Sequence, residues 1–504
     1  MALSIFDKIL YYVMLPILCI GSILSPLTND ARIFYSTQYL AYAHFSFPQG
    51  ISYVWEIKPI FSHIFNYCLV VFTCALVPFS NHFAQEIIIK TIAVALAIVA
   101  SYLFAKNVLK IKYSFTLCFI SLFACLNLNI LQMEWLAIIL SMISCALFME
   151  TKNYYHYIAG ALLILVLLSK GTTGCLIISA ICTVLIFNKL RLDWIRGGMG
   201  FVVTGLLFFV ASQTIWKEMI SDILISPVLS HVGEYDMVAQ VGVTAIATVI
   251  SMSIYIPIVG LGLVYGSLWI KNHIRETEAK LLIISWLVIA ITVWAQSESF
   301  PYQYYAFALP AIVGLVLYER DTPKEKKGKL KLKRENVITT SIIILFAMWC
   351  VLYSPQPLWG LEQNYGVQEL KMNNFFDKSA NEMEVKFNLS KEKTLLYLDT
   401  GAGPHYTNGI NTSCRYVAPL VIQRANPGRL IVSNLSQYWD EYNCIMSYTD
   451  NGRYILADGT LGKEDGWMGM DSVEKRNLAS KILENYDEVY SGAWTLYEHK
   501  KQSK

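Results

Sequence analysis

Long apolar segments in the first 354 residues constrain the fold of this chain more than any other feature. Many run for about 15 to 20 residues, enough for a helix to cross a hydrocarbon core of roughly 30 Å. Lipid offers no partner to backbone polar groups, so such segments are predicted to be helices. They lie at 9–27, 60–79, 86–105, 113–131, 133–149, 156–168, 172–187, 198–216, 242–269, 281–297, 303–318 and 337–354.

The composition separates the chain into two regions. Of the 504 residues, 55% are hydrophobic and 15% are charged, and the mean hydropathy is +0.44. Soluble domains carry about 25% charged residues, so most of this chain suits lipid. Residues 355–504 differ, with mixed charge, turns and short strand patterns. We therefore predict an α-helical polytopic membrane domain over 1–354 and a soluble α/β domain over 355–504.

The soluble region has its own predicted elements. Cys414 and Cys444 are its only cysteines. They form a disulfide if the domain faces an oxidising compartment and stay free if it does not, and the sequence leaves both alternatives open. The residue patterns predict strands at 394–399, 429–433 and 444–448, a helix at 473–486 and a closing hairpin at 488–498.

Basic clusters predict the orientation, because Lys and Arg remain preferentially on the cytoplasmic side. The clusters lie at 106–112, 189–196, 271–280 and 320–334, the last with eight basic residues. All four clusters lie on one side of the membrane only if segment 60–79 does not cross it. We therefore interpret 60–79 as a juxtamembrane or re-entrant segment. This predicts about eleven spans in a multi-pass plasma-membrane protein. Its N-terminus is cytoplasmic and its C-terminal domain extracytoplasmic.

Polar residues gather on the predicted outer side, at the ends of apolar segments. Each has a structural alternative, because loop charges commonly face water and interfacial tyrosines commonly form an aromatic belt. Asp30 also suits the N-cap of a following helix. Lys170 stands out, since a lysine between two apolar stretches is costly unless it reaches the interface or meets an anion. The candidates are Asp30, Arg32, Glu56, Lys58, His63, Glu134, Lys170, His231, Glu298, Tyr302 and Gln303.

The order of several short motifs carries a family resemblance. Along the chain these are Asn29-Asp30-Ala31-Arg32, Trp55-Glu56-Ile57-Lys58-Pro59, Glu134, Lys170-Gly171 and Ser299-Phe300-Pro301-Tyr302-Gln303-Tyr304-Tyr305. Together they resemble the GT-C membrane glycosyltransferases that use polyprenyl-phosphate sugar donors. The branch with protein O-mannosyltransferases and the lipid A aminoarabinose transferase is the most similar. Many members have two adjacent acids in the first motif, whereas here Asn29 leaves Asp30 as the lone carboxylate.

The resemblance implies a GT-C fold and transfer of a sugar from a polyprenyl-phosphate donor to an extracytoplasmic acceptor, which is a glycan, lipid or protein. In an inverting single displacement, Asp30 acts as the base. Glu134 either assists it or joins it as a ligand of a divalent metal such as Mg²⁺ or Mn²⁺. The cations Arg32, Lys58 and Lys170 hold the donor phosphate. Tyr302 and Gln303 line the same site at the outer side of the membrane. Lower-ranked site candidates are Glu56, His63, His231 and Glu298.

No nucleic acid is expected as a partner of this chain. Two other functions fit a chain of this composition. A transporter or flippase of lipid-linked sugars would place ionisable residues near mid-bilayer in repeated halves. The sequence has no repeated halves and few charges within apolar segments, with Lys90 near the end of one. A non-catalytic membrane scaffold with an exported domain is the other alternative. Release of free polyprenyl phosphate from a sugar donor distinguishes a transferase from both.

Overall fold

The computed structural model describes most of the helical region and much of the C-terminal region. The isolated residues 8, 12, 13, 16, 19, 20 and 23 are described near the N-terminus. The helical ranges are 60–77, 82–110, 133–169, 174–215, 257–296 and 306–321. Further along the chain the described ranges are 382–383, 385–392, 394–398, 411–412, 414, 436–457, 473–492 and 495–501.

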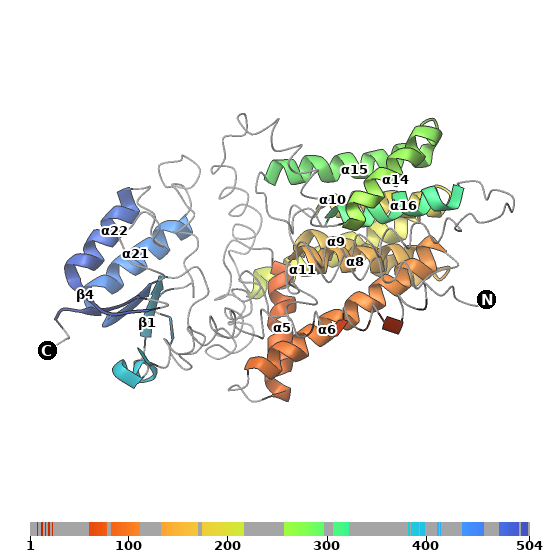
Figure 1. Ribbon diagram of the computed structural model, residues 1–504. Helices are drawn as coiled ribbons and strands as arrows, with labels where there is room; N and C mark the ends of the chain where they lie inside the picture. Colours follow the sequence, from red (N-terminus) through yellow and green to blue (C-terminus); the bar gives the residue numbers. More distant parts are fainter. Residues whose placement is uncertain are drawn as a thin grey trace. The chain divides into compact units, whose positions relative to one another are not determined.

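The chain divides into two compact units, which are described separately. The first, called here the helical unit, contains the described helices from α6 to α16, except for residues 82–85 of α6 and 211–215 of α11 (Figure 1). The second contains α5 (Ile60–Leu76) and the described elements from Leu389 onward. The predicted boundary between 354 and 355 lies outside the described residues and stays a prediction.

Most helices of the helical unit occupy predicted apolar segments. Segment 242–269 is described only from Pro257, and 113–131 and 337–354 lie outside the described residues. The helices are α6 (His82–Leu103) with the π-helix η2 (Phe104–Leu109), α8 (Met133–Phe148), α9 (Asn153–Ser169), α10 (Gly174–Phe187), α11 (Trp194–Ile215), α14 (Pro257–His273), α15 (Thr277–Gln296) and α16 (Ala308–Asp321).

Two stretches of these helices are long and apolar enough to cross a membrane, Ile87–Leu109 and Trp194–Ala211. The second is 11% buried inside the protein, and it exposes large apolar side chains along its whole length. An apolar surface of this extent suits lipid better than water. Its exposed residues include Ile195, Met199, Val202, Leu206 and Val210.

At one end of the helical unit, neighbouring helices and their turns contact one another. Asn107 Nδ2 of η2 donates to Glu150 Oε1 after α8 at 2.7 Å, and Cys145 of α8 donates to the Ala180 carbonyl of α10. A hydrophobic cluster then ties the C-terminal ends of α10, α14 and α16 to the start of α15. The cluster contains Ile186, Trp269, Ala279, Leu282, Val313 and Leu317.

This end holds the described parts of all four basic clusters, and we call it the basic end. The sequence predicted that the clusters share one side, and within the described residues the structure brings them together. Its basic residues are Lys106, Lys110, Lys152, Lys189, Arg191, Arg196, Lys271, Arg275, Lys280 and Arg320.

Glycines let two helix pairs approach closely. A Cβ on Gly160 of α9 would lie 1.8 Å from the carbonyl oxygen of Gly197 on α11, so only glycine fits there. Gly262 and Gly266 of α14 meet Ala311 and Gly314 of α16 in the same manner. Small residues at helix contacts are typical of membrane helix packing, in which van der Waals contact replaces the hydrophobic effect as the driving force.

The second unit contains a mixed five-stranded sheet with strand order β2-β1-β3-β5-β4. β1 runs parallel to β2 and β3, while β5 runs antiparallel to β3 and β4. Helices α21 and α22 lie over one face of the sheet (Figure 1). The elements are β1 (Thr394–Leu398), β2 (Asn411–Thr412), α21 (Ser436–Asn451), β3 (Tyr454–Ala457), α22 (Val473–Asn485), β4 (Tyr486–Ser491) and β5 (Thr495–His499).

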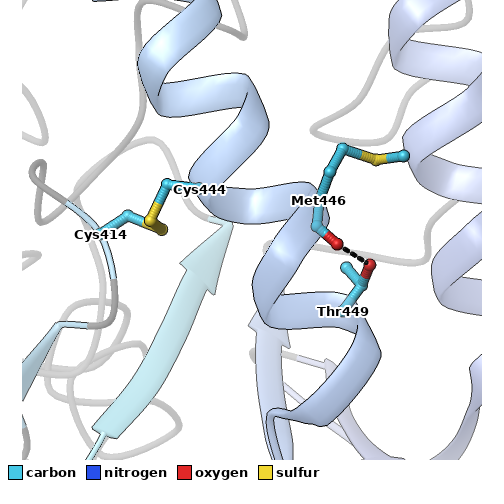
Figure 2. Close-up of a disulfide and its surroundings, with 4 residues drawn as sticks. All are labelled: Cys414, Cys444, Met446 and Thr449. Carbon is cyan, nitrogen blue, oxygen red and sulfur yellow. Dashed lines mark hydrogen bonds between the residues drawn. A yellow bond between two sulfur atoms is a disulfide. The ribbon is translucent and has the colours of Figure 1, made fainter.

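A disulfide joins Cys414 to Cys444 on α21, with the two Cα atoms 5.9 Å apart (Figure 2). Further along α21, Thr449 Oγ1 donates to the Met446 carbonyl at 2.7 Å (Figure 2). The structure therefore selects the bonded alternative that the sequence left open. The bridge attaches a residue just after β2 to the helix that precedes β3.

Three sequence predictions in this unit are confirmed and one is wrong. The strand at β1, the helix at α22 and the closing hairpin of β4 and β5 are present. The predicted strand 444–448 instead lies within α21. Tyr442, Ile445 and Thr449 are buried at helical spacing, which a five-residue window cannot distinguish from a strand. The predicted strand 429–433 lies outside the described residues.

Segment 60–79 forms α5, a continuous helix from Ile60 to Leu76. Ser62, Asn66 and Thr73 are buried along it, so these polar residues do not interrupt the helix. The helix is 17 residues long. Whether it lies along the membrane or re-enters it stays a prediction.

Candidate functional site

Glu134 is the candidate site residue whose side chain the structure describes. It lies in the first turn of α8, and its side chain is buried, at 3% exposure. The basic end begins where α8 ends at Phe148, fourteen residues away, or ~21 Å at the helical rise. Glu134 is therefore at the opposite end of the helical unit, which we call the Glu134 end.

Helix ends that flank other candidate residues lie at the same level. α9 runs from the basic end to Ser169, ~24 Å along its axis, and α10 returns from Gly174, ~20 Å from its own end. Residues 170–173, which include Lys170, connect these two helices. The C-terminus of α15 at Gln296 and the start of α16 at Ala308 likewise flank 297–305.

The position of Glu134 has two electrostatic consequences. A carboxylate in the first turn of a helix interacts favourably with the positive end of the helix dipole. Burial opposes this, because removing a carboxylate from water is costly unless other groups compensate for the lost hydration. Trp135 beside it is fully buried, so the local environment is apolar as well. A buried acid of this kind is an established indicator of a functional site in a membrane protein.

Other predicted site residues cannot be placed from this structure. His63 belongs to helix α5, but its side chain lies outside the description. The remaining candidates fall outside the described residues, and their roles stay predictions. They are Asp30, Arg32, Glu56, Lys58, Lys170, His231, Glu298, Tyr302 and Gln303.

The predicted metal site includes residues outside the described ranges. Among the described residues, no three His, Cys, Asp or Glu side chains converge as a ligand set. Glu134 supplies a carboxylate oxygen, which Mg²⁺ and Mn²⁺ accept as a ligand. Its predicted partner Asp30 is not described. The metal therefore remains a prediction, and the roles of the residues below do not depend on it.

The basic end contains a polar network that sequence reasoning missed. His156 Nδ1 of α9 pairs with Asp193 Oδ2 before α11 at 3.2 Å, and its Nε2 pairs with the Glu150 carbonyl at 2.9 Å. Asp193 also accepts hydrogen bonds from the backbone N–H and the guanidinium of Arg196, at 3.1 and 2.6 Å. Together with the Asn107–Glu150 hydrogen bond, these contacts join η2 to the α8–α9 and α10–α11 connections.

One signal in the sequence could have identified Asp193. An aspartate directly before a long apolar run is typical of a helix N-cap, and the Arg196 N–H is the donor such a cap satisfies. That backbone hydrogen bond is the largest cause that lowers the pKa of Asp193. The hydrogen bonds from His156 and the Arg196 guanidinium lower it further, while partial desolvation opposes them.

A second paired acid lies at the basic end, where α14 and α16 finish. Asp321 accepts hydrogen bonds from Trp269 Nε1 at 2.9 Å and from the guanidinium of Arg320 at 2.6 and 2.8 Å. Burial would raise the pKa of Asp321, but these hydrogen bonds outweigh it and the net shift is downward. The acids of the basic end thus bind one turn to another, which is a structural task.

Comparison with known proteins gives a fold assignment. No family model matches the chain, and no curated protein matches it in sequence. Among solved structures, the chain is similar to ArnT from Cupriavidus metallidurans bound to undecaprenyl phosphate. Their TM-score is 0.53 at 12% identity, over 97% of each chain. The apo form of the same ArnT gives a TM-score of 0.52 at 11% identity, again over 97% of each chain.

This similarity spans almost the full length of both chains, so it concerns the whole architecture and not one shared motif. ArnT is an aminoarabinose transferase of the GT-C family. The likeness agrees with the resemblance carried by the sequence motifs. The chain therefore has the fold of the GT-C superfamily of glycosyltransferases.

Proposed function

We propose that this protein is a membrane glycosyltransferase that takes its sugar from a polyprenyl-phosphate donor. One observation carries the proposal: the fold matches, over 97% of both chains, a structure that holds undecaprenyl phosphate. The motif order in the sequence supports it independently. Transfer of a pentose or hexose to a glycan, lipid or protein acceptor is compatible with these observations.

We assign the chemistry to Glu134, at its end of the helical unit, and to the residues that the family resemblance implies. Asp30 takes the proton of the acceptor nucleophile, and Glu134 assists it or holds a divalent ion. Such a base contributes about 10²- to 10⁴-fold to the rate. The leaving polyprenyl phosphate is an anion, and Arg32, Lys58 and Lys170 stabilise it as negative charge develops. Burial of Glu134 supports this assignment, because a buried carboxylate responds strongly to a nearby proton or cation.

We place the basic end in the cytoplasm and the Glu134 end on the outer side of the plasma membrane. Ten described Lys and Arg residues gather at the basic end, which fits the preference of basic residues for the cytoplasmic side. The Cys414–Cys444 disulfide supports an outer C-terminal domain, because disulfides persist in oxidising compartments. A Gly328→Cys variant should resist a membrane-impermeant thiol label added to intact cells. Labelling of this cysteine from outside intact cells would contradict the proposed orientation.

The decisive experiment follows the leaving group. Purified protein is incubated with a radiolabelled polyprenyl-phosphate sugar and an acceptor extract, and free polyprenyl phosphate is measured. We expect wild-type protein to release it and Asp30→Asn, expressed at an equal level, to release none above background. A wild-type protein that moves the intact donor across a vesicle membrane without cleaving it would instead be a flippase.

A further inference from the structure

The turn between α10 and α11 presents exposed side chains to which the proposed mechanism assigns no role. Its exposed basic residues are Lys189 and Arg191, and its exposed apolar residues are Leu190, Trp194 and Ile195. The exposed fractions of these three apolar residues are 49%, 58% and 76%. Large apolar groups that gather beside charged ones on a surface are typical of an interaction site. We call these residues the anchor turn.

The backbone of the anchor turn has an unfavourable conformation. Lys189 and Leu190 have φ angles of 50° and 64°, in the left-handed region that residues other than glycine rarely adopt. The Leu190 N–H donates to the Leu185 carbonyl at 2.8 Å and closes the end of α10, and glycine is common in a helix end of this kind. Two residues with side chains thus occupy positions at which glycine would avoid the strain. Strained backbone of this kind is concentrated at functional sites.

The two cations of the anchor turn are available to an anion from outside the protein. Within the described residues, the ammonium of Lys189 and the guanidinium of Arg191 form no ion pair. The acid nearest to them in the chain, Asp193, is paired with Arg196 at 2.6 Å and with His156 at 3.2 Å. Asp193 thus already has its cation within the protein, and the anchor turn keeps an excess of positive charge.

The anchor turn lies where α11 begins, and this determines its level relative to the membrane. Trp194 is the first residue of the candidate span Trp194–Ala211, whose exposed apolar surface continues at Val202. Tryptophan is enriched where a span passes from the hydrocarbon core into the headgroup region. Lys189 and Arg191 shortly precede Trp194 in the chain, so they lie at the level of the lipid headgroups when α11 lies in a bilayer.

We propose that the anchor turn binds an anionic phospholipid of the leaflet at the basic end. Arg191 offers parallel N–H donors to the lipid phosphate, and Lys189 adds a compact positive charge. Leu190, Trp194 and Ile195 lie against the adjoining part of the acyl chains. A zwitterionic lipid also has a phosphate, but its own cation repels the turn. The inference uses the membrane placement proposed above and is independent of the transfer reaction.

The main alternative is a diffuse attraction, in which all cations of the basic end contribute equally to the binding of anionic lipid. Lys271 and Lys280 are the matched pair for this comparison, because both are exposed at the basic end. The turn that separates them contains the acids Glu276 and Glu278. None of residues 271–280 has a left-handed backbone. Removal of this pair eliminates the same charge without altering the anchor turn.

The test titrates the full-length protein in neutral detergent with fluorescent phosphatidylglycerol and, separately, with fluorescent phosphatidylcholine. We expect wild type to prefer phosphatidylglycerol, and added salt to reduce the preference. Lys189→Gln combined with Arg191→Gln should weaken binding of phosphatidylglycerol about 10- to 30-fold, the effect of two basic contacts with an anionic lipid. Lys271→Gln combined with Lys280→Gln should change it by less than about twofold, because salt screens exposed charges that do not contact the lipid.

Lys189→Gly separates lipid binding from folding. Glycine adopts the left-handed region without strain, so this variant should unfold at a higher temperature than wild type in detergent without added lipid. It should nevertheless bind phosphatidylglycerol more weakly, because it lacks the ammonium. Wild-type affinity for phosphatidylglycerol in this variant would overturn the role of Lys189.

Two further results would overturn the proposal. Equal losses in the two double variants would assign the lipid preference to the basic end as a whole. A wild-type protein that binds both lipids equally would remove the preference itself. Release of polyprenyl phosphate from a sugar donor, measured on the same preparations, tests the proposed function separately. It should stay within about twofold of wild type in both double variants, and a wild-type protein that releases none would contradict the proposed function and not the lipid site.

Discussion

The two ends of the helical unit use their charged residues in opposite ways. At the basic end, Asp193 and Asp321 are partly exposed, and each pairs with an arginine close to it in the chain and with a ring nitrogen of another helix, His156 or Trp269. At the other end, Glu134 is buried beside the buried Trp135. Within the described parts of α8 to α16, Glu134 is the one charged residue away from the basic end. One end therefore holds the helices together, and the other is the end to which we assign the chemistry.

The largest expected effect concerns the acids of the two ends. Glu134→Gln should lower the rate of sugar transfer by about 10²-fold or more, because it removes a carboxylate that acts in proton transfer or metal binding. Glu150→Gln is the matched change at the basic end and should stay within about twofold of wild type. Turnover of polyprenyl-phosphate sugar by the purified variants measures both. Equal rates for Glu134→Gln and wild type would remove the distinction between the ends.

The second prediction concerns the close contact between α9 and α11 near the basic end. Gly160→Ala should destabilise the protein by about 1–3 kcal/mol, because its Cβ would overlap the Gly197 carbonyl and force the two helices apart. Gly198→Ala is the control, since no atom lies within 4 Å of a Cβ there. Alanine also favours the helix by about 1 kcal/mol. Thermal unfolding in detergent measures the stability of both variants. Equal stability of Gly160→Ala and the wild-type protein would show that α9 and α11 separate freely at this contact.

The third prediction tests whether the network at the basic end is structural. Asp193→Asn should cost about 1–2 kcal/mol, because it weakens a charge-assisted hydrogen bond to Arg196 and the pair with His156. Transfer activity per folded molecule should remain close to that of wild type. Unfolding midpoints and initial rates, compared on the same preparation, provide the measurement. A large loss of activity without a loss of stability would assign a functional role to this end.

The smallest effect is the pH dependence of the same residue. The pKa of Asp193 in the folded protein is below its usual value of about 4. Its contribution to stability is therefore complete above the usual value and is lost as the pH falls through the lower, folded-state pKa. The difference in unfolding midpoint between wild type and Asp193→Asn should shrink below about pH 4. A difference that is constant from pH 7 to pH 3 would exclude this origin.

Sequence patterns predicted the helices of this protein well, for a physical reason. Lipid demands long apolar segments, so α6, α8, α9, α10, α11 and α15 coincide with segments visible in the sequence. The elements of the C-terminal region were predicted less well, because a short buried run of residues suits either a strand or a helix. Tertiary packing made 444–448 part of α21, and β3, a buried four-residue strand, was not predicted.

The candidate site was predicted only in part. Glu134 could be identified because an acid at the start of an apolar segment is rare. The His156–Asp193 pair joins residues 37 positions apart, so it arises from the fold and not from a local motif.

The central claim is that donor phosphate binds at the Glu134 end. An experimental structure of the protein with bound undecaprenyl phosphate tests it most directly. The account predicts that the phosphate lies at the level of Glu134, with its lipid chain along the helical unit. A phosphate bound among the lysines and arginines of the basic end would contradict the account.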